Sequence, residues 1–446
     1  MAKKPGNKII EPSKKTVLNN TTVSNEGSKS NILGKYYSYL INFWIFIPAV
    51  IYFTVVNKYI VNIPCLDDYN AVLEFLTKFK TTSGIDKWAL LFSQHADHRI
   101  LHSRIIYVLY YYIFGKINFI HIILIANFQL VIIFFILTRF IKKAIPKYWN
   151  IISLVVGFCL FDLSSYENAD FAMCGLQNYG VIMLFLISLY LFNLDGRKFI
   201  VLATLFEVIC LFSSGNGLIC ALCITIFLVF KREKIKYIAS GCVFLVCSPL
   251  YYFHYTKSTA MGSVSEVFAS MRDTRFFFHM LGSHFSYENG ILIGVVVLGA
   301  LLLMFPANLK LKFKPETLPF FCVLLALFGT VITISIFRSS AGEIASYWSR
   351  YIVYSHIIVA ILFVFVCIKF EGKKPFWYLG AVGVVVLLFA YKSNYEYGEN
   401  MLEMTKKRLE YYPYYYGSHS PADMNTAKAI ETEACKQGIY CIQDER

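Results

Sequence analysis

The feature that most constrains this chain is a series of eleven apolar runs separated by polar segments, some short and some long. A helix needs about 20 apolar residues to cross a bilayer, because the hydrocarbon core is about 30 Å thick and each residue adds about 1.5 Å. The runs cover residues 40–61, 118–140, 149–163, 179–193, 199–212, 218–230, 237–253, 291–304, 318–336, 351–368 and 376–391. They predict an all-α fold, a polytopic membrane helical bundle of about 11 spans.

Two neighbouring runs, 199–212 and 218–230, hold only 14 and 13 residues. As helices they reach about 20 Å, which is short of the hydrocarbon thickness. They either cross the membrane separately or together form one re-entrant hairpin over residues 199–230. Both arrangements leave the two ends of the pair on the same side, so the orientation of the other spans does not depend on the choice.

Basic residues are concentrated in alternate connections. The first 35 residues carry seven Lys and two Glu without apolar periodicity, which predicts a disordered basic tail over 1–35. The loops that carry two to four Lys or Arg each are 139–147, 195–198, 231–236, 310–314 and 369–374. The positive-inside rule places these loops and the N-terminus in the cytoplasm. We therefore expect a transmembrane domain over 36–391 and an extracytoplasmic C-terminal tail over 392–446.

Composition excludes some classes of protein and leaves one question about cysteines. Apolar residues form 57% of the chain, which is high for a soluble protein. The net charge is +14, but basic clusters interleaved with aromatics are confined to short loops and the tail, so we expect no nucleic acid partner. Most of the 12 Cys lie within apolar runs. Cys435 and Cys441 stand in the tail and form a disulfide if that end lies in an oxidising compartment.

Two adjacent carboxylates, Asp67 and Asp68, follow the first apolar run and stand at the predicted membrane boundary. Like charges at this distance repel each other, and each raises the pKa of the other. One interpretation is a plain loop in which Asp68 caps a helix that begins near Tyr69. The other is a chemical role for the pair, and the residues alone leave both open.

A second polar segment contains His95, Asp97, His98 and Arg99, with His102 after it. If this segment is helical, the three His and Arg99 share one side of the helix. Such a cluster favours one of three roles: a zinc site, an interfacial helix that presents cations to lipid head groups, or a site for an anionic phosphate.

Other polar side chains stand at the predicted outer ends of spans. Amides and carboxylates can bind sugar hydroxyls, and they can equally cap helices or close turns; those singled out here are Glu167, Asn168, Gln177 and Asn216. Arg272 and Arg350 lie in amphipathic or span-initial segments. A guanidinium there binds a phosphate in bidentate fashion or anchors the helix at the interface.

These features together resemble the GT-C class of membrane glycosyltransferases, which use polyprenyl-phosphate-linked sugars. The layout is similar from residue 40 to about residue 413. The short motifs resemble those of a broad bacterial set that includes the serotype-converting glucosyltransferases of O-antigen; they are Asp67-Asp68-Tyr69, His98-Arg99, Glu167-Asn168 with Gly175 and Gln177, Asn216-Gly217 and Ser349-Arg350-Tyr351. The chain departs from the set at Cys174, where an aromatic is usual, and at Ala96-Asp97, where Asn-Glu is commoner.

The resemblance implies GT-C-like outer loops and transfer of a hexosyl unit, such as glucosyl, to a cell-surface glycan such as lipopolysaccharide O-antigen. The reaction is expected on the outer face of the bacterial cytoplasmic membrane. Asp67 or Asp68 is the implied base. The implied substrate-binding residues are His98, Arg99, Glu167, Asn168, Gln177, Asn216, Arg272 and Arg350.

The expected partners are a polyprenyl-phosphate-linked sugar, a glycan acceptor and membrane lipid. The sequence assigns no metal ligand, and it is compatible with a divalent metal cofactor as well as with none. Two alternative functions use similar features: a transporter or flippase for a lipid-linked sugar, and a glycan polymerase. Outward cations and a mid-span acid such as Glu207 suit a transporter.

Overall fold

The structure is a computed structural model that describes residues 43–256, 265, 274–285, 289–310, 315–339, 345–346, 348–415 and 420–442, with the backbone alone at 304–310. Contacts group Ile45–Arg446 into one compact unit, apart from Met1–Trp44, and the description below concerns the former. The predicted tail over 1–35 and the candidate residue Arg272 lie outside the described residues.

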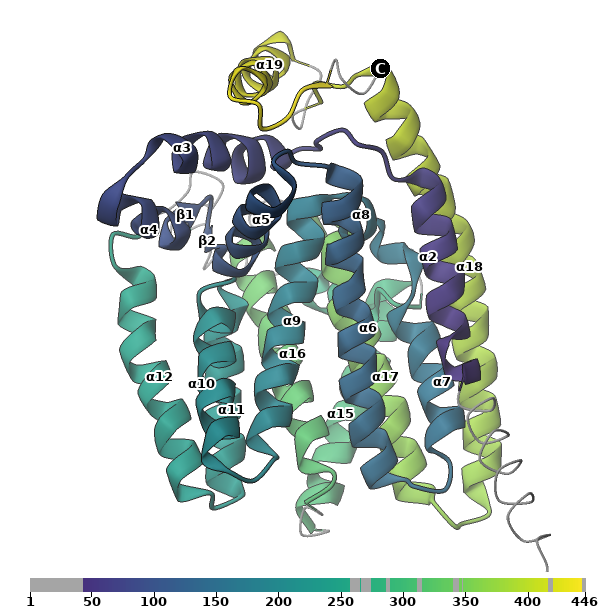
Figure 1. Cartoon of the computed structure of the whole chain (residues 1–446). Helices are drawn as coiled ribbons and strands as arrows, with labels where there is room; N and C mark the ends of the chain where they lie inside the picture. The colour runs from purple at the N-terminus through teal and green to yellow at the C-terminus, as the bar shows by residue number, and fades with distance from the viewer. Residues whose placement is uncertain are drawn as a thin grey trace, which may run out of the picture. The chain divides into compact units, whose positions relative to one another are not determined.

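Each of the eleven apolar runs forms a helix, so the prediction of an all-α helical bundle is confirmed (Figure 1). The eleven helices are α2 (Ile47–Tyr59), α6 (Phe119–Ala144), α7 (Trp149–Leu160), α9 (Ala172–Phe192), α10 (Arg197–Leu211), α11 (Asn216–Phe230), α12 (Lys234–Tyr252), α15 (Gly290–Lys310), α16 (Leu318–Arg338), α17 (Ile352–Phe370) and α18 (Pro375–Tyr411). The last of these continues well past the predicted end of its span, into the region assigned to the C-terminal tail.

Seven helical stretches among the described residues are long and apolar enough to cross a membrane. They are Phe119–Ala144, Trp149–Asp170, Ala172–Phe192, Lys234–Tyr252, Leu318–Arg338, Ser349–Phe370 and Pro375–Tyr411. Three shorter apolar helices are Trp44–Tyr59, Asn216–Phe230 and Gly290–Leu303. A multi-pass membrane protein follows from these helices, and the count of eleven spans stays a prediction.

The basic loops lie together at one end of the unit. The connections α6–α7, α9–α10, α11–α12 and α17–α18 are all at the lower end in Figure 1, where the predicted cytoplasmic loops should meet. The small helices and the only strands of the described chain gather at the opposite end. They include α3 (Phe75–Thr81), α4 (Gly84–Phe92), β1 (Gln94–His95), β2 (His98–Arg99), α5 (Leu101–Phe114), α8 (Tyr166–Asp170) and α19 (Pro421–Lys436). The other short described elements are η1 (Trp44–Phe46), η2 (Tyr69–Glu74), η3 (Leu163–Ser165), α14 (Arg275–Gly282) and η6 (Ser349–Tyr351).

The segment with the three histidines is not one helix, so that expectation is wrong. β1 and β2 pair as a short antiparallel hairpin in which His95 faces His98 and Gln94 faces Arg99. Ala96 has a φ of 44°, in the left-handed region, which lets the chain reverse within two residues. His102 instead belongs to α5, and the hairpin therefore sets His98 and His102 on different elements.

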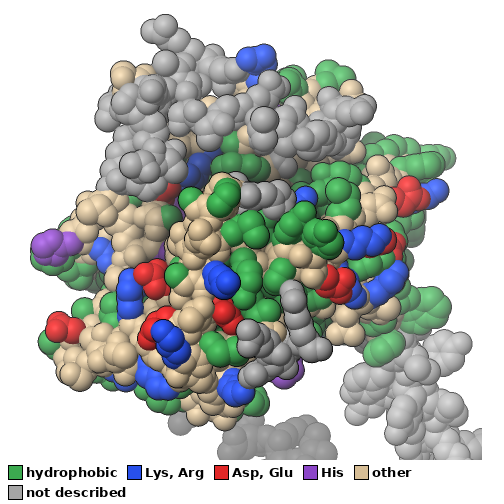
Figure 2. All heavy atoms as spheres, turned by 90° about the horizontal axis from the view of Figure 1, so that it is seen from above, with side chains coloured by type: hydrophobic (Ala, Val, Ile, Leu, Met, Phe, Trp, Pro, Cys, Tyr) green, Lys and Arg blue, Asp and Glu red, His purple; other side chains and the backbone are tan. Residues whose placement is uncertain are grey.

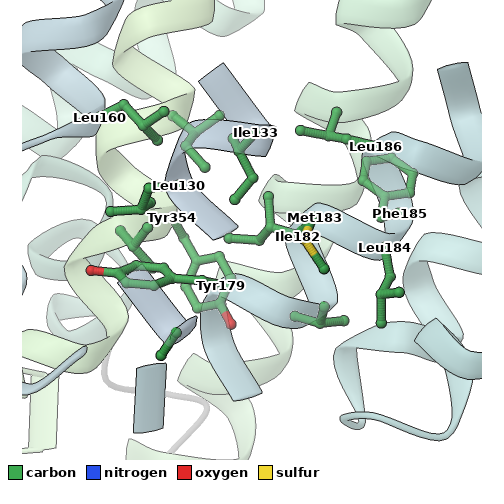
Figure 3. Close-up of a cluster of buried hydrophobic side chains, with 14 of the residues drawn as sticks. Leu130, Ile133, Leu160, Tyr179, Ile182, Met183, Leu184, Phe185, Leu186 and Tyr354 are labelled. Carbon is green, nitrogen blue, oxygen red and sulfur yellow. The ribbon is translucent and has the colours of Figure 1, made fainter. Parts of the chain in front are cut away.

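The core is built around α9, which packs against α6 and α10 and is buried along nearly its whole length. Figure 3 shows side chains of α6, α7, α9 and α17 meeting there, among them Leu130, Leu160, Leu186 and Tyr354. A helix that is apolar on all sides has to be surrounded by other elements. The packing of α9 positions its first turns, whose polar side chains Gln177 and Asn178 line the cavity described below.

Candidate functional site

A cavity of about 600 Å³ opens where the upper ends of α9, α11, α12 and α16 meet the β1–β2 hairpin and η6. Nine of the ten residues singled out in the sequence are described, and five of them line this cavity: Asp67, His98, Gln177, Asn216 and Arg350. The other four do not line it: Asp68, Arg99 and Asn168 are buried, and Glu167 is half-buried. Segments far apart in the sequence are thus brought to one place.

Asp67 and Asp68 occupy different environments although they are neighbours in the chain. The Asp67 side chain is partly exposed on the cavity wall, and among the described residues none donates a hydrogen bond to its carboxylate. Asp68 is 1% exposed. Its carboxylate accepts hydrogen bonds from the N–H groups of Met173 at 2.8 Å and Cys65 at 3.2 Å, and so ties the loop to the start of α9. Burial raises the pKa of Asp68 to about 7, and the charge of Asp67 adds to that effect.

Arg350 is held by Glu167 at the start of α17. Its terminal nitrogen Nη2 lies 3.0 Å from Glu167 Oε1, and its backbone N–H donates to Oε2 of the same carboxylate at 3.1 Å. The guanidinium also lies over the Trp348 ring, 5.1 Å from the centroid. Arg350 Nε is buried and has no partner in the described structure. The side chain is therefore fixed in place, with a donor still available on a group that lines the cavity.

A second arginine, Arg338, lines the same cavity and was not selected from the sequence. Its Nη2 lies 2.9 Å from Asp97 Oδ2, and the Asp97 side chain is 1% exposed. The sequence did carry a signal, since Arg338 ends a long apolar run and Asp97 adjoins His98. A cation at the end of a span is usually interpreted as an interface anchor, so the sequence alone did not indicate that Arg338 lines the cavity.

His98 is a neutral acceptor in the cavity wall. Burial lowers the pKa of His98 to about 4, and the nearby charge of Arg338 lowers it further. Its Nδ1 accepts a hydrogen bond from the Gly215 N–H at 3.4 Å, just before α11 begins. His95 also lines the cavity, and burial lowers its pKa against the opposing effect of the Asp67 charge.

The amides form a continuous chain of hydrogen bonds. Asn216 Nδ2 donates to the Tyr354 hydroxyl at 3.0 Å, and that hydroxyl donates to Asn178 Oδ1 at 3.1 Å. Asn178 in turn donates to Asn168 Oδ1 at 2.9 Å. Gly175 allows this packing, because a side chain at that position would collide with the Asn168 backbone. These hydrogen bonds hold Asn168 in place outside the cavity, whereas Asn216 at the other end of the series lines it.

Arg99 serves the hairpin and not the cavity. Its Nε donates to the Tyr251 carbonyl at 2.7 Å and its Nη2 to the Phe253 carbonyl at 2.5 Å, and Nη1 donates to the Phe92 carbonyl. All three side-chain nitrogens of Arg99 donate to backbone oxygens, and these hydrogen bonds anchor β2 to the end of α12. Among the described residues it does not line the cavity.

The remaining wall is aromatic and apolar. Tyrosines and apolar side chains line the side of the cavity toward α12 and α16; they are Tyr251, Tyr252, Tyr255, Ile334, Ile336 and Phe337. Figure 2 looks down on this end of the molecule, where Lys and Arg side chains stand beside Asp and Glu among hydrophobic ones. The cavity thus combines two paired cations, one unpaired carboxylate, several amides and an apolar side, which suits an amphipathic ligand that carries an anionic group.

Among the described residues, no cavity side chain belongs to a group of three or more metal-ligating atoms within 4.8 Å of one another. Groups of residues whose ligand atoms are close enough to hold a metal ion lie elsewhere in the unit. Comparison with protein families, with curated proteins and with solved structures finds no significant match to this chain. The function therefore has to be argued from the cavity itself.

Proposed function

We propose that the chain is a glycosyltransferase that moves a hexosyl unit from a polyprenyl-phosphate sugar to a cell-surface glycan at the outer face of the bacterial cytoplasmic membrane. The observation that carries the proposal is that Asp67, Arg338 and Arg350 line one cavity. The unpaired carboxylate of Asp67 can accept a proton as a general base, and the guanidinium groups of Arg338 and Arg350 can bind a phosphate. The apolar side of the cavity receives the beginning of the lipid.

The reaction uses one proton transfer and one displacement. Asp67 takes the proton of an acceptor hydroxyl, whose oxygen forms a bond to the anomeric carbon of the sugar. The bond between that carbon and the phosphate oxygen breaks, and the electron pair leaves with the polyprenyl phosphate. Arg338 and Arg350 stabilise the negative charge that develops on the departing phosphate. Gln177 and Asn216 offer donors and acceptors for sugar hydroxyls.

Two features support an extracytoplasmic cavity. The basic loops gather at the end of the unit opposite to the cavity. A disulfide joins Cys435 in the last turn of α19 to Cys441 beyond it, and disulfides persist in oxidising compartments. The small elements around the cavity and the C-terminal segment lie at the same end.

The test is an assay with purified full-length protein in detergent, a defined polyprenyl-phosphate hexose and a glycan acceptor. Asp67→Asn is expected to lower kcat by about 100-fold or more, the usual effect of losing a general base. Arg350→Lys is expected to lower kcat/KM, because Lys cannot keep both its Glu167 partner and a forked contact to phosphate.

The matched control is Asp86→Asn, an exposed carboxylate on α4 that is outside the cavity, and it should keep wild-type activity. Full activity of Asp67→Asn contradicts the mechanism. Product formed in detergent excludes a pure transporter or flippase, since no second compartment is present. Transfer that requires a lipid-linked oligosaccharide donor and fails with a monosaccharide donor identifies a glycan polymerase instead.

A further inference from the structure

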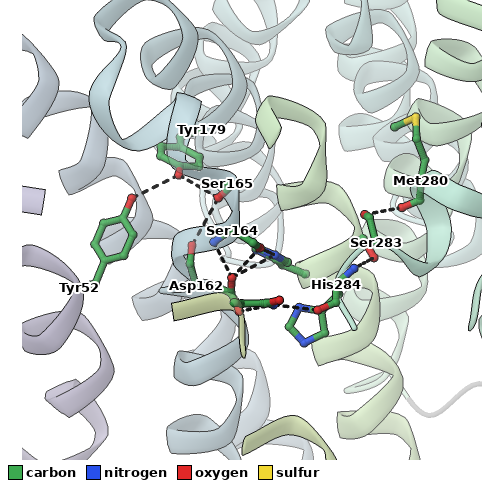
Figure 4. A network of polar contacts seen from close by, with 11 residues as sticks. Tyr52, Asp162, Ser164, Ser165, Tyr179, Met280, Ser283 and His284 are labelled. Carbon is green, nitrogen blue, oxygen red and sulfur yellow. Dashed lines mark hydrogen bonds and ion pairs between the residues drawn. The ribbon is translucent and has the colours of Figure 1, made fainter. Parts of the chain in front are cut away.

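A second cluster of chemically active side chains lies outside the cavity, between η3, α14 and α17. Asp162, His284 and His356 each offer one ligand atom, and the three atoms lie within 4.8 Å of one another. All three residues are buried, with at most 1% of their surface exposed. Figure 4 shows Asp162 and His284 approaching each other from different elements. None of the three lines the cavity described above.

The carboxylate is held in position before any ligand binds. Asp162 Oδ1 accepts hydrogen bonds from the Ser164 N–H at 2.8 Å and the Ser164 hydroxyl at 2.6 Å. Its Oδ2 accepts from Asn394 Nδ2 on α18 at 2.9 Å, and the same amide donates to the His284 carbonyl at 2.8 Å. Supporting hydrogen bonds of this kind are typical of carboxylates that ligate metals.

The imidazoles, in contrast, have ring nitrogens without partners. Neither ring nitrogen of His284 has a hydrogen-bond partner among the described residues, and the same holds for Nδ1 of His356. A buried polar atom without a partner costs about 1–3 kcal/mol. A cation bound to one ring nitrogen of His284 gives that nitrogen a partner. The nitrogen of His356 that lies nearest to Asp162 is Nε2, which shares a hydrogen bond with the Ser164 hydroxyl at 3.0 Å.

The distances suit a transition-metal ion. His356 Nε2 lies 3.6 Å from Asp162 Oδ1. Two ligands of a tetrahedral zinc ion, each about 2.0–2.1 Å from the metal, lie about 3.4 Å apart. The two imidazole rings stand at 76° to each other with centroids 4.9 Å apart, so they do not stack and can direct nitrogens toward a common point. Two imidazoles and one carboxylate are a ligand set that zinc accepts.

We infer that Asp162, His284 and His356 bind a divalent transition-metal ion, of which zinc fits the ligand set best. The ion joins the segments that carry the Glu167–Arg350 pair: Asp162 precedes Glu167 by five residues, and His356 follows Arg350 by six. Its role is to fix these segments, which are otherwise held together by hydrogen bonds. The inference does not depend on the proposed transferase activity.

The test is the metal content of full-length protein produced in zinc-supplemented medium and purified without chelator. Wild-type protein is expected to contain about one zinc per chain, as a single three-ligand site requires. His284→Gln and His356→Gln are expected to lose most of it. His102→Gln is the matched control, because it removes a half-buried histidine on α5 and leaves the cluster intact.

A second measurement uses only the wild-type protein, so it tests the site even if the histidine variants fail to fold. Wild-type protein loaded with Co²⁺ should show the strong visible absorption of a tetrahedral site, and Zn²⁺ should displace it. Metal-free wild-type protein, or zinc retained in both histidine variants, overturns the inference. Neither readout requires a glycosyl donor, so failure of the transferase assay and failure of the metal site are distinguishable.

Discussion

Asp67 and Asp68 show that the surroundings of a residue decide whether its side chain lines the cavity. Asp67 reaches the cavity, whereas Asp68 turns inward and receives two backbone N–H groups. Of the two acids, only Asp67 lines the cavity. The sequence predicted a role for the pair, but it could not assign the base to one member. The geometry favours Asp67.

The raised pKa of Asp68 predicts a pH-dependent stability. Between its ordinary value of 3.8 and about 7, the folded protein holds a proton on this carboxyl that the unfolded chain has lost. The free energy of unfolding therefore falls as pH rises through this window, by on the order of 4 kcal/mol, and levels off above it. Asp68→Asn should remove this fall, and thermal unfolding in detergent from about pH 4 to about pH 8 measures it.

Histidines have to be separated from this effect. The lowered pKa of His98 acts in the opposite direction, since its protonation favours the unfolded chain between about 4 and its ordinary value of 6.5. The informative quantity is therefore the difference between wild type and Asp68→Asn at each pH, with Asp86→Asn as the control. A difference that stays constant across the range contradicts a buried, proton-holding Asp68.

At the scale of elements, the C-terminal helix holds the first outer loop in place. Ser420 caps α19 by accepting the Asp423 N–H at 3.1 Å, and Pro421 stands at its first helical position. In the turn after the helix, the Ile439 carbonyl accepts the Ile117 N–H at 2.8 Å, and the Tyr440 hydroxyl donates to the Asn62 carbonyl at 2.6 Å. These bonds lie close to the loop that carries Asp67.

Deleting residues 420–446 should therefore loosen that loop without unfolding the bundle. Amide hydrogen exchange in residues 62–74 is expected to increase, because η2 loses the helix packed against it. Exchange in the buried part of α9 should be unchanged. Mass spectrometry of the two peptides in full-length and shortened protein measures the contrast. Equal protection of residues 62–74 in both proteins would show that α19 is not needed to hold η2.

For the whole molecule, the sequence predicts which segments form helices, but it does not predict which side chains of different helices contact one another. Apolar runs of sufficient length have few alternatives in a bilayer, so each predicted run forms a helix. The supports of the cavity come from contacts that no local pattern records. Tyr354 stands in an apolar run and reads as a core aromatic, yet its hydroxyl links Asn216 to Asn178. Asp162, His284 and His356 come from three distant segments, which hid their cluster.

The orientation of the whole unit decides whether a lipid-linked sugar from the outer leaflet can reach Asp67. α4 and the α9–α10 connection lie at opposite ends of the unit (Figure 1). Trp88 on α4 is 66% exposed, and Asp195 in the connection is also exposed. In a background with the exposed Cys242 replaced by Ala, Trp88→Cys should react with a membrane-impermeant maleimide in intact spheroplasts.

Asp195→Cys should react only after lysis, because the basic loops are predicted to face the cytoplasm. Each variant serves as the control for the other, and mass spectrometry of the purified protein measures the labelled fraction. The reverse pattern places the Asp67 cavity in the cytoplasm. A cell-surface acceptor is then out of reach, and the proposed transfer fails even if Asp67 and the two arginines bind a sugar phosphate.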